Sequence, residues 1–366
     1  MKKIYTLIIL FSIAFGFSQP PAGYYATATG TGFILKTQLF NIIKNHNDRG
    51  YSGLYTTYQS SDVDSFYEND GTLLDMYSEN PTGVDPYNYS IISSAQRCGS
   101  YAVEGDCYNR EHVIPQYFFN SGSPMISDAH SVTPTDGKVN GLRNNFPHGQ
   151  AVATGGTTTL NGSRLASGIN SGYAAGYSGT VFEVLDEFKG DIARIYFYFA
   201  TRYQDLINTW GTTYPMFDGS TDVVFTPTFK NILLQWNLND PVSQREIVRN
   251  NSIYARQNNR NPYIDNNNYV ASVWGLAPSQ LGISDFELNA DLNIYPNPTN
   301  GSTINISAKI AIDELEITNI NGQLIQIIKK PIFENNTYTL ENLNQGFYFL
   351  RLTSDNQTLT RKVIVN

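Results

Sequence analysis

Glutamate, histidine and asparagine side chains in a short central stretch of the chain could together hydrolyse a phosphodiester bond. This reaction needs a base that takes a proton from water, and a hard cation that neutralises charge on the phosphate and on the leaving oxygen. Histidine, with an ordinary pKa of about 6.5, suits the base. Carboxylate and amide oxygens suit magnesium or calcium. Glu111, His112 and Asn140 provide this minimal set.

These three residues lie in the densest group of reactive side chains in the sequence, at residues 109–145. A carboxylate beside a histidine is unremarkable alone, because a single histidine is more often structural than catalytic. The second half of the segment, DAHSVTPTDGKVNGLRNN at residues 128–145, strengthens the interpretation with a second histidine, His130, and further polar groups.

The segment resembles the endonuclease I family, which carries the ββα-metal or His-Me finger. In that motif a strand ends in Arg-Glu-His, a second strand follows, and a helix returns an asparagine to the metal. Arg110, Glu111 and His112 match the tripeptide, and the spacing from Pro134 to Asn140 matches the approach to the asparagine. The likeness extends over residues 24–275 and includes residues 75–78, 98–107, 188–194, 240–242, 249–250 and 259–265.

The resemblance implies a role for each matching residue. His112 would be the general base, and Glu111 and Asn140 would hold one divalent cation, with Mg²⁺ first and Ca²⁺ or Mn²⁺ as alternatives. His130 would position the substrate or orient other side chains of the site.

One departure from the family concerns the arginine with which some relatives hold the scissile phosphate. Residues 111–137 contain neither Arg nor Lys, so another residue must do this. The candidates are Arg143, one turn beyond Asn140, and Arg110, Arg194 and Arg260. We rank Arg143 first as a catalytic residue, although it could equally form a structural ion pair.

Hydrophobic periodicity predicts the helices around this segment. We expect helices at residues 34–44, at 182–203, and from Asp240-Pro241 to about residue 258. A row of arginines would line one side of the last helix, where it could bind phosphates or form a solvated face: Arg245, Arg249, Arg256 and Arg260. Residues 151–180 are rich in Gly, Thr, Ser and Ala and predict an exposed loop. The expected fold class is α+β, a mainly helical nuclease domain around the finger followed by a small β-sandwich.

The composition changes after Gly282, and the rest of the chain predicts that β-sandwich. Turn signals separate expected short strands at residues 303–308, 314–318, 323–328, 347–353 and 360–365. The module resembles the sorting domain of the type IX secretion system, in IYPNP at 294–298, LNQGFYFLRL at 343–352 and RKVIV at 361–365. The resemblance implies that the type IX machinery is a partner; an adhesive β-domain is the alternative. We expect a catalytic domain at 19–282, a linker at 283–291 and the sorting domain at 292–366.

The N-terminus predicts export. Lys2 and Lys3 precede an apolar run at residues 4–17 that is too short for a comfortable membrane span, so residues 1–18 read as a signal peptide, with an uncleaved anchor as the alternative. No other stretch is apolar enough to cross a bilayer, so we expect no span in the mature protein. Export would let Cys98 and Cys107 form a disulfide. A zinc site is a poorer interpretation, because two cysteines without CxxC spacing make an incomplete one.

The net charge of −8 bears on how the chain would bind nucleic acid. Nucleic-acid-binding proteins usually have a basic surface, so here a local patch and the metal must attract the phosphates. We therefore expect a monomeric, secreted or surface-attached endonuclease of DNA, RNA or both, largely nonspecific for sequence, with 5′-phosphate products implied by the resemblance. One alternative is an inactive surface-displayed binding protein that keeps the fold. A serine esterase is disfavoured because the G-x-S-x-G pattern does not occur.

Overall fold

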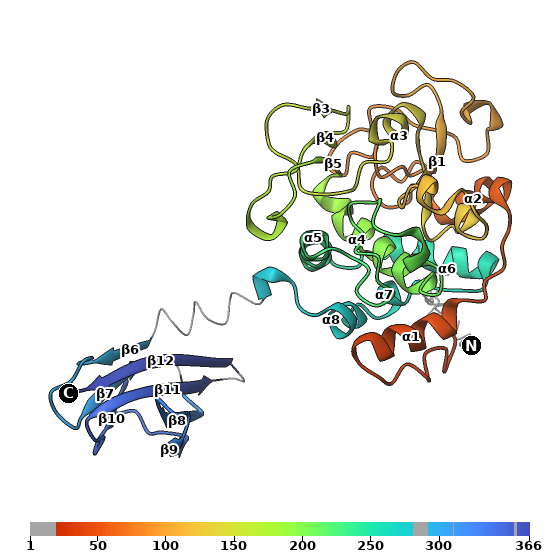
Figure 1. Cartoon of the computed structure of the whole chain (residues 1–366). Coiled ribbons are helices and arrows are strands. Elements are labelled where there is room, and N and C mark those ends of the chain that lie inside the picture. The colour runs from red at the N-terminus through yellow and green to blue at the C-terminus, as the bar shows by residue number, and fades with distance from the viewer. Residues whose placement is uncertain (1–19, 281–291, 310, 355–356) are drawn as a thin grey trace, which may run out of the picture. The chain divides into compact units, whose positions relative to one another are not determined.

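The computed structural model describes residues 20–280, 292–309, 311–354 and 357–366, and the chain divides into two compact units (Figure 1). The first unit ends at Ala277 and the second begins at Pro278. The predicted signal peptide at 1–18 and linker at 283–291 lie outside the described residues. Within the described ranges, no helix is long and apolar enough to cross a membrane.

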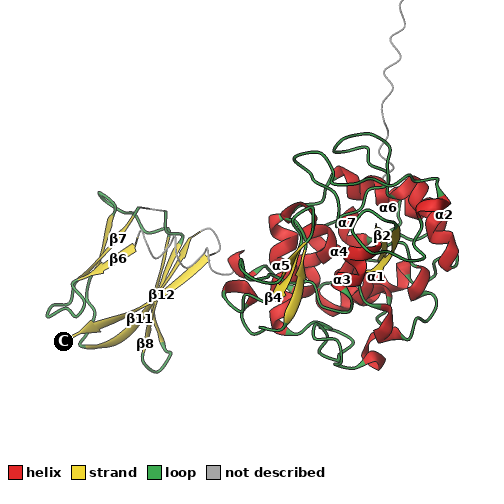
Figure 2. Ribbon diagram, turned by 90° about the horizontal axis from the view of Figure 1, so that it is seen from above, coloured by secondary structure: helices red, strands yellow, loops and turns green. Residues whose placement is uncertain are grey.

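The first unit combines helices with two small groups of strands (Figure 2). The helices are α1 (Gly32–Ile43), α2 (Leu54–Ser61), α3 (Gly137–Arg143), α4 (Asp186–Arg202), α5 (Pro227–Asn239), α6 (Gln244–Gln257), α7 (Pro262–Asp265) and α8 (Asn268–Trp274). The strands are β1 (Tyr108–His112), β2 (Val132–Asp136), β3 (Thr157–Thr158), β4 (Arg164–Ser167) and β5 (Thr180–Glu183). The predicted mixture of helices and strands is confirmed.

Helix α4 forms the centre of the first unit. Every residue from Gly190 to Arg202 is buried, and the helix packs against α1, α5 and α7. A helix that is buried on all sides belongs to the interior of a domain. Its few polar side chains must therefore find partners inside the protein.

Two of the predicted helices differ from the observed ones at their N-terminal ends. Residues 180–183 form β5, and α4 starts only at Asp186. The predicted start at Asp240 is also wrong, because Asp240 ends α5 and accepts a hydrogen bond from the Gly190 backbone N–H (2.7 Å). Helix α6 begins after Ser243, which forms a capping box with Glu246. The prediction for α1 is confirmed to within two residues.

The segment predicted as an exposed loop contains strands. Residues 151–180 include β3 and β4, which form an antiparallel sheet with β5 in the order β3-β4-β5. Pairing with β5 supplies backbone hydrogen bonds, and Ala166 of β4 is buried in the main core. The loop prediction is therefore wrong for this part of the segment.

The second unit consists of two antiparallel sheets around one hydrophobic core. Its strands are β6 (Leu292–Tyr295), β7 (Ile304–Ala308), β8 (Glu314–Asn319), β9 (Leu324–Lys329), β10 (Thr337–Leu340), β11 (Gly346–Ser354) and β12 (Gln357–Val365). The sheet orders are β10-β7-β6 and β12-β11-β8-β9. Alternate side chains of both sheets, among them Ile306 and Leu350, share this core. The predicted strand-rich C-terminal module is confirmed.

Candidate active site

Strands β1 and β2 and helix α3 lie next to one another in the structure. The strands pair antiparallel, from Tyr108 opposite Asp136 to His112 opposite Val132. Helix α3 starts directly after β2 because the Asp136 carboxylate caps it, accepting a hydrogen bond from the Val139 backbone N–H (2.8 Å). This strand–strand–helix arrangement returns Asn140 to the side of β1.

A disulfide stabilises this arrangement next to the start of β1. Cys98 and Cys107 are bonded, with their Cα atoms 4.9 Å apart, so the predicted disulfide is present. The Cys107 carbonyl accepts a hydrogen bond from the Gly137 backbone N–H (2.8 Å) at the start of α3. A side chain at position 137 would overlap Cys98 Sγ, which explains the glycine there. Closing a loop of this length contributes roughly 2–3 kcal/mol in the chain-entropy model.

The Glu111 carboxylate is held in place by hydrogen bonds to one of its two oxygens. Oε1 accepts from the Tyr77 hydroxyl (3.0 Å) and from the Arg143 guanidinium (2.9 Å). Among the described residues, none donates a hydrogen bond to Oε2. Burial raises the pKa of Glu111 to about 7, although Arg143 and Tyr77 lower it. A cation at the free oxygen would favour the ionised carboxylate.

The His112 imidazole is oriented by one hydrogen bond to the backbone. Nε2 lies 3.1 Å from the Ile126 carbonyl oxygen and donates to it, which leaves Nδ1 as the basic nitrogen. Burial lowers the pKa of His112 to about 4, and Arg110 and Arg143 lower it further, against the effect of the Ile126 hydrogen bond. The ring is therefore neutral at neutral pH and can accept a proton.

Asn140 completes a set of oxygen donors that fits a hard divalent cation. Its Nδ2 donates to the Arg110 carbonyl (3.3 Å), which leaves Oδ1 available beside β1. Together with Glu111 Oε2, this gives two oxygen ligands of the kind that Mg²⁺ and Ca²⁺ prefer. So few protein ligands leave coordination positions for phosphate and water. The residues present thus fit the predicted cation.

Arg110 presents a guanidinium that no carboxylate neutralises, as far as the described residues go. It stacks on the Tyr51 ring, with Cζ 3.5 Å from the ring centroid, and donates to the Tyr51 carbonyl (3.1 Å). Arg110 and His112 are two residues apart on β1 and so lie on the same face. The Tyr51 ring also lies 5.8 Å from the His112 ring. Arg110 is half-buried and lies on the same face of β1 as His112.

Arg143 does not have the position predicted for a phosphate-binding residue. Its side chain is only 1% exposed and lies behind Glu111. It donates to Glu111 Oε1 and to the carbonyls of His112 (2.9 Å) and Val113 (2.6 Å). The structural ion pair that the sequence left open is the one observed. This buried network continues through Tyr77 to His148 (2.6 Å between the hydroxyl and Nε2).

The other two candidate arginines are also buried in ion pairs and cannot reach a substrate at the surface. Arg194 on α4 forms two hydrogen bonds with the Glu246 carboxylate (2.6 and 2.7 Å) and is fully buried. Arg260 pairs in the same way with Asp265 (2.7 Å for both) and is 1% exposed. Burial of a charge requires such a partner. The prediction of substrate contacts for Arg194 and Arg260 is corrected accordingly.

Two arginines of the predicted row on α6, Arg245 and Arg249, are inward-facing as well, whereas Arg256 is half-buried. Arg245 pairs with Asp191, and Arg249 pairs with Asp62 (2.8 Å). Both side chains are less than a tenth exposed. Neither the phosphate-binding nor the solvated-face interpretation holds for them, because they join α6 to α4 and to the end of α2.

His130 is part of the interior and does not contact a surface ligand. It is 1% exposed, and its Nε2 lies 3.0 Å from the Asn259 carbonyl oxygen. Its neighbour Asp128 is fully buried and accepts hydrogen bonds from the Tyr198 and Tyr203 hydroxyls (2.8 Å each) and from Gln257 (2.9 Å). His130 thus belongs to a polar cluster that holds the loop between β1 and β2 against α4 and α6.

Replacing Asp128 by asparagine should destabilise the protein by about 2–3 kcal/mol at pH 7. Burial opposes ionisation, but His46, His130 and the Gln257 hydrogen bond lower the pKa of Asp128 to about 2. Because this folded-state pKa is below the unfolded value of about 3.9, the stabilisation is present above pH 4 and is lost as the pH falls towards 2. Urea unfolding of both proteins at pH 7, 5 and 3 measures this.

The exposed Asp205 offers the matched control, since Asp205→Asn should change the unfolding free energy little. Equal losses in the two variants, or a difference that grows at low pH, would contradict the assignment for Asp128.

Sequence reasoning missed the tyrosines around the site. Tyr77 orients Glu111, and Tyr51 stacks on Arg110. The segment at residues 75–78 belongs to the family likeness but carries no recognisable chemistry of its own. Asp75 in this segment accepts hydrogen bonds from Thr135 Oγ1 (2.7 Å) and from the Asp136 backbone N–H (2.8 Å). Only the folded chain shows that it braces β2.

Comparison with known proteins accounts for both units. Residues 31–268 match the family Endonuclease I, and residues 293–366 match the secretion system C-terminal sorting domain. An extracellular ribonuclease of Bacillus amyloliquefaciens is 31% identical over 260 residues, which are 69% of this chain and 78% of the relative. An extracellular ribonuclease of Bacillus subtilis is 30% identical over 263 residues, with the same two shares. Endonuclease-1 of Buchnera aphidicola is 28% identical over 155 residues, 42% of this chain and 51% of the relative.

Proposed function

Because the chain belongs to the endonuclease I family and is a secreted or cell-surface endonuclease with a C-terminal sorting domain of the type IX secretion system, we propose that β1, β2 and α3 form its ββα-metal, or His-Me, finger. We propose that the enzyme hydrolyses DNA and RNA without strong sequence preference, with one divalent cation, Mg²⁺ first. The names of the Bacillus relatives support activity on RNA.

One observation carries the proposal, namely the arrangement of free donor atoms around β1. The hydrogen bonds of Glu111, Asn140 and His112 use one polar atom of each side chain. They leave Glu111 Oε2, Asn140 Oδ1 and His112 Nδ1 available. An un-neutralised guanidinium, that of Arg110, lies on the same face of β1 as the base. Oxygen ligands, a neutral base and a nearby cationic side chain are the groups that metal-assisted phosphodiester hydrolysis uses.

The proposed mechanism assigns one task to each residue. Glu111 and Asn140 would hold the cation, which would supply positive charge to neutralise the phosphate and the leaving oxygen. His112 Nδ1 takes a proton from a water molecule in line with the scissile bond. The water oxygen bonds to phosphorus while the bond to the 3′-oxygen breaks. The products are a 5′-phosphate and a 3′-hydroxyl, whose proton comes from solvent.

In place of Arg143, we propose Arg110 as the residue that binds the scissile phosphate. Tyr51 and Tyr55 fix its guanidinium plane from the sides, with Cζ 3.5 and 4.6 Å from their ring centroids. Stacking of this kind restricts the side chain without using up its charge. A fixed planar guanidinium can then donate two hydrogen bonds to phosphate oxygens.

Replacing Arg110 by glutamine should lower kcat/KM for a short nucleic-acid substrate by about 10–100-fold, because a charge-assisted hydrogen bond to phosphate contributes about 1.5–3 kcal/mol. Steady-state cleavage of a labelled oligonucleotide at fixed salt measures the change. Arg164→Gln serves as the control, because Arg164 is also half-buried and bonded to backbone carbonyls, but lies on β4. Similar losses in the two variants would refute the role of Arg110.

The direct test of the proposed function is nicking of a supercoiled plasmid and of a long RNA by the purified full chain, with Mg²⁺, Mn²⁺, Ca²⁺ or chelator. We expect cleavage of both substrates with Mg²⁺ and none with chelator. Cleavage that persists in chelator would reject the metal-dependent mechanism. Tight nucleic-acid binding by folded protein without cleavage under any condition would favour the alternative of a surface-displayed binding protein.

A further inference from the structure

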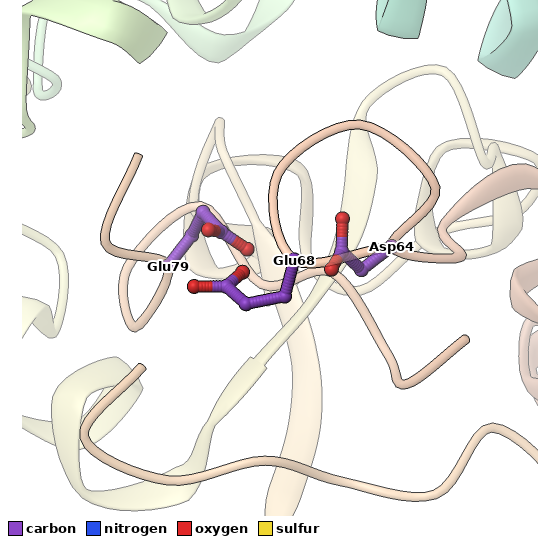
Figure 3. Close-up of side chains that lie close together, drawn as sticks. All are labelled: Asp64, Glu68 and Glu79. Atoms are coloured by element: carbon purple, nitrogen blue, oxygen red, sulfur yellow. The ribbon is translucent and has the colours of Figure 1, made fainter. Parts of the chain in front are cut away.

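The geometry points to a second divalent-cation site in the first unit, a Ca²⁺ site formed by Asp64, Glu68 and Glu79. Ligand oxygens of these three carboxylates all lie within 4.8 Å of one another. Figure 3 shows the Glu68 and Glu79 carboxylates facing each other with Asp64 beside them. None of the three belongs to the proposed catalytic centre, and the inference does not depend on the proposed function.

The buried oxygens of this cluster lack the donors that carboxylates normally find. Glu79 is only 1% exposed, yet its Oε1 has no hydrogen-bond partner, and Glu68 Oε2 is buried without one as well. A buried charged group left in this state is costly unless it is paired or binds a metal. Each of the three residues offers a carboxylate oxygen within 4.8 Å of those of the other two, so a single cation could contact all three.

Asp64 is already arranged as a ligand. Its Oδ1 accepts from the backbone N–H groups of Phe66 and Tyr67 (3.1 Å each), and its Oδ2 accepts from that of Asn69 (3.1 Å). These bonds fold the loop so that Glu68 comes back towards Asp64. Each carboxylate oxygen has two lone pairs and can bind a cation as well.

No basic side chain replaces the cation in the part of the chain that the structure describes. None of the salt bridges among the described residues involves Asp64, Glu68 or Glu79. Like charges this close are held together at neutral pH by a proton or by a metal.

The ligand chemistry favours Ca²⁺ over Mg²⁺. Ca²⁺ accepts six to eight oxygens in flexible geometry, including bidentate carboxylates, whereas Mg²⁺ keeps most of its water and binds to one or two carboxylates. Three carboxylates on two loops suit the larger ion. Extracellular Ca²⁺ modules bind with dissociation constants of about 10⁻⁴–10⁻³ M, which suits a secreted protein.

This site would fasten the segment that supports the catalytic centre. Glu79 lies two residues after Tyr77, which orients Glu111. The Glu79 backbone N–H donates a hydrogen bond to the Asp75 carbonyl (2.8 Å). Asp75 in turn holds β2. A cation between Glu79 and Asp64 would thus tie this segment to the loop after α2.

Calorimetric titration of the chelator-treated full chain with CaCl₂ in excess Mg²⁺, together with thermal melts, tests the inference. The wild type and Glu111→Gln should each bind one equivalent of Ca²⁺, and Glu79→Gln should bind none. Ca²⁺ at 100-fold above its dissociation constant should raise the Tm of the wild type by about 5–10 °C, and that of Glu79→Gln not at all. Glu187→Gln, at an exposed acid near the cluster, should behave as the wild type.

A second comparison separates a cation site from a structural glutamate. In EGTA, Glu79→Gln should melt at or above the wild-type temperature, because it removes one of three carboxyl groups that crowd one another without a cation. A variant that melts several degrees lower in EGTA, or one that still binds Ca²⁺, would overturn the site, as would a wild type that binds no Ca²⁺. Cleavage is a separate readout, so loss of cleavage in Glu111→Gln with Ca²⁺ binding intact tests the catalytic proposal alone.

Discussion

Replacing His112 by alanine should lower the rate of phosphodiester cleavage by about 10²–10⁴-fold, because the proposed general base is removed. The proposed cation ligands Glu111 and Asn140 do not bond to the imidazole, so cation binding should remain. Single-turnover cleavage of an oligonucleotide with saturating Mg²⁺ measures the chemical step, and calorimetry measures the cation affinity.

His46→Ala provides a matched histidine control. His46 is also largely enclosed, and its Nδ1 accepts a hydrogen bond from Arg202 (3.1 Å) outside the site. The His46→Ala protein should cleave nucleic acid at close to the wild-type rate. Added imidazole should restore part of the activity of His112→Ala and none of that of Glu111→Gln. Wild-type cleavage by a folded His112→Ala protein would eliminate His112 as the base.

Replacing Arg143 by methionine should reduce the unfolding free energy by about 3–5 kcal/mol, the usual result of removing one partner of a buried ion pair. The Glu111 side chain, which is only 2% exposed, would then lack the Arg143 guanidinium that pairs with it. The carbonyls of His112 and Val113 would lose their hydrogen-bond donor. Chemical denaturation monitors the loss. The control is Asp186→Asn, which breaks the ion pair between Asp186 and Lys189. Because the Asp186 side chain is 95% exposed, this substitution should lower the unfolding free energy by only about 0–1 kcal/mol.

Arg143→Lys separates the two roles that the sequence allowed for this residue. Lysine keeps the charge but cannot reproduce the hydrogen bonds to Glu111 and to two carbonyls. If Arg143 positions Glu111, the main loss should be in cation affinity, with KM for nucleic acid little changed at saturating Mg²⁺. A raised KM with unchanged cation affinity would instead support contact with phosphate.

The positions of Glu111, His112 and Asn140 were predictable because the elements that carry them are local. The two short strands and the helix all lie between residues 108 and 143, and antiparallel pairing of the strands brings Asn140 back to β1, where it donates to the Arg110 carbonyl. The cap at Asp136 and the glycine at 137 mark the start of the helix in the sequence itself.

Arg143 and Arg194 could not be sorted from the sequence, because their partners are far away along the chain. Glu111 lies 32 residues before Arg143, and Glu246 lies 52 residues after Arg194. An arginine one turn beyond a ligand has the same local pattern whether it faces a phosphate or a buried carboxylate. For Arg143, only the packing of α3 against β1 decides between the two.

Local signals were also ambiguous at element boundaries. Asp240-Pro241 has the pattern of a helix start, yet Asp240 ends α5 and caps the Gly190 backbone N–H across the interface with α4. The residues that form β3 and β4 show no hydrophobic alternation, and their strands exist because β5 is there to pair with. The acidic cluster is similar, since Glu79 joins Asp64 and Glu68 from a separate loop with no recognisable spacing.

The contact between Gly137 and the disulfide restricts how this protein can change over evolutionary time. Any side chain at position 137 would collide with Cys98 Sγ and Tyr101, and relief would displace the first turn of α3 and, with it, Asn140. While the disulfide exists, the position is closed to every residue but glycine; without it, the smaller substitutions become possible. A descendant of this enzyme that has replaced Gly137 should therefore also have lost the cysteine pair.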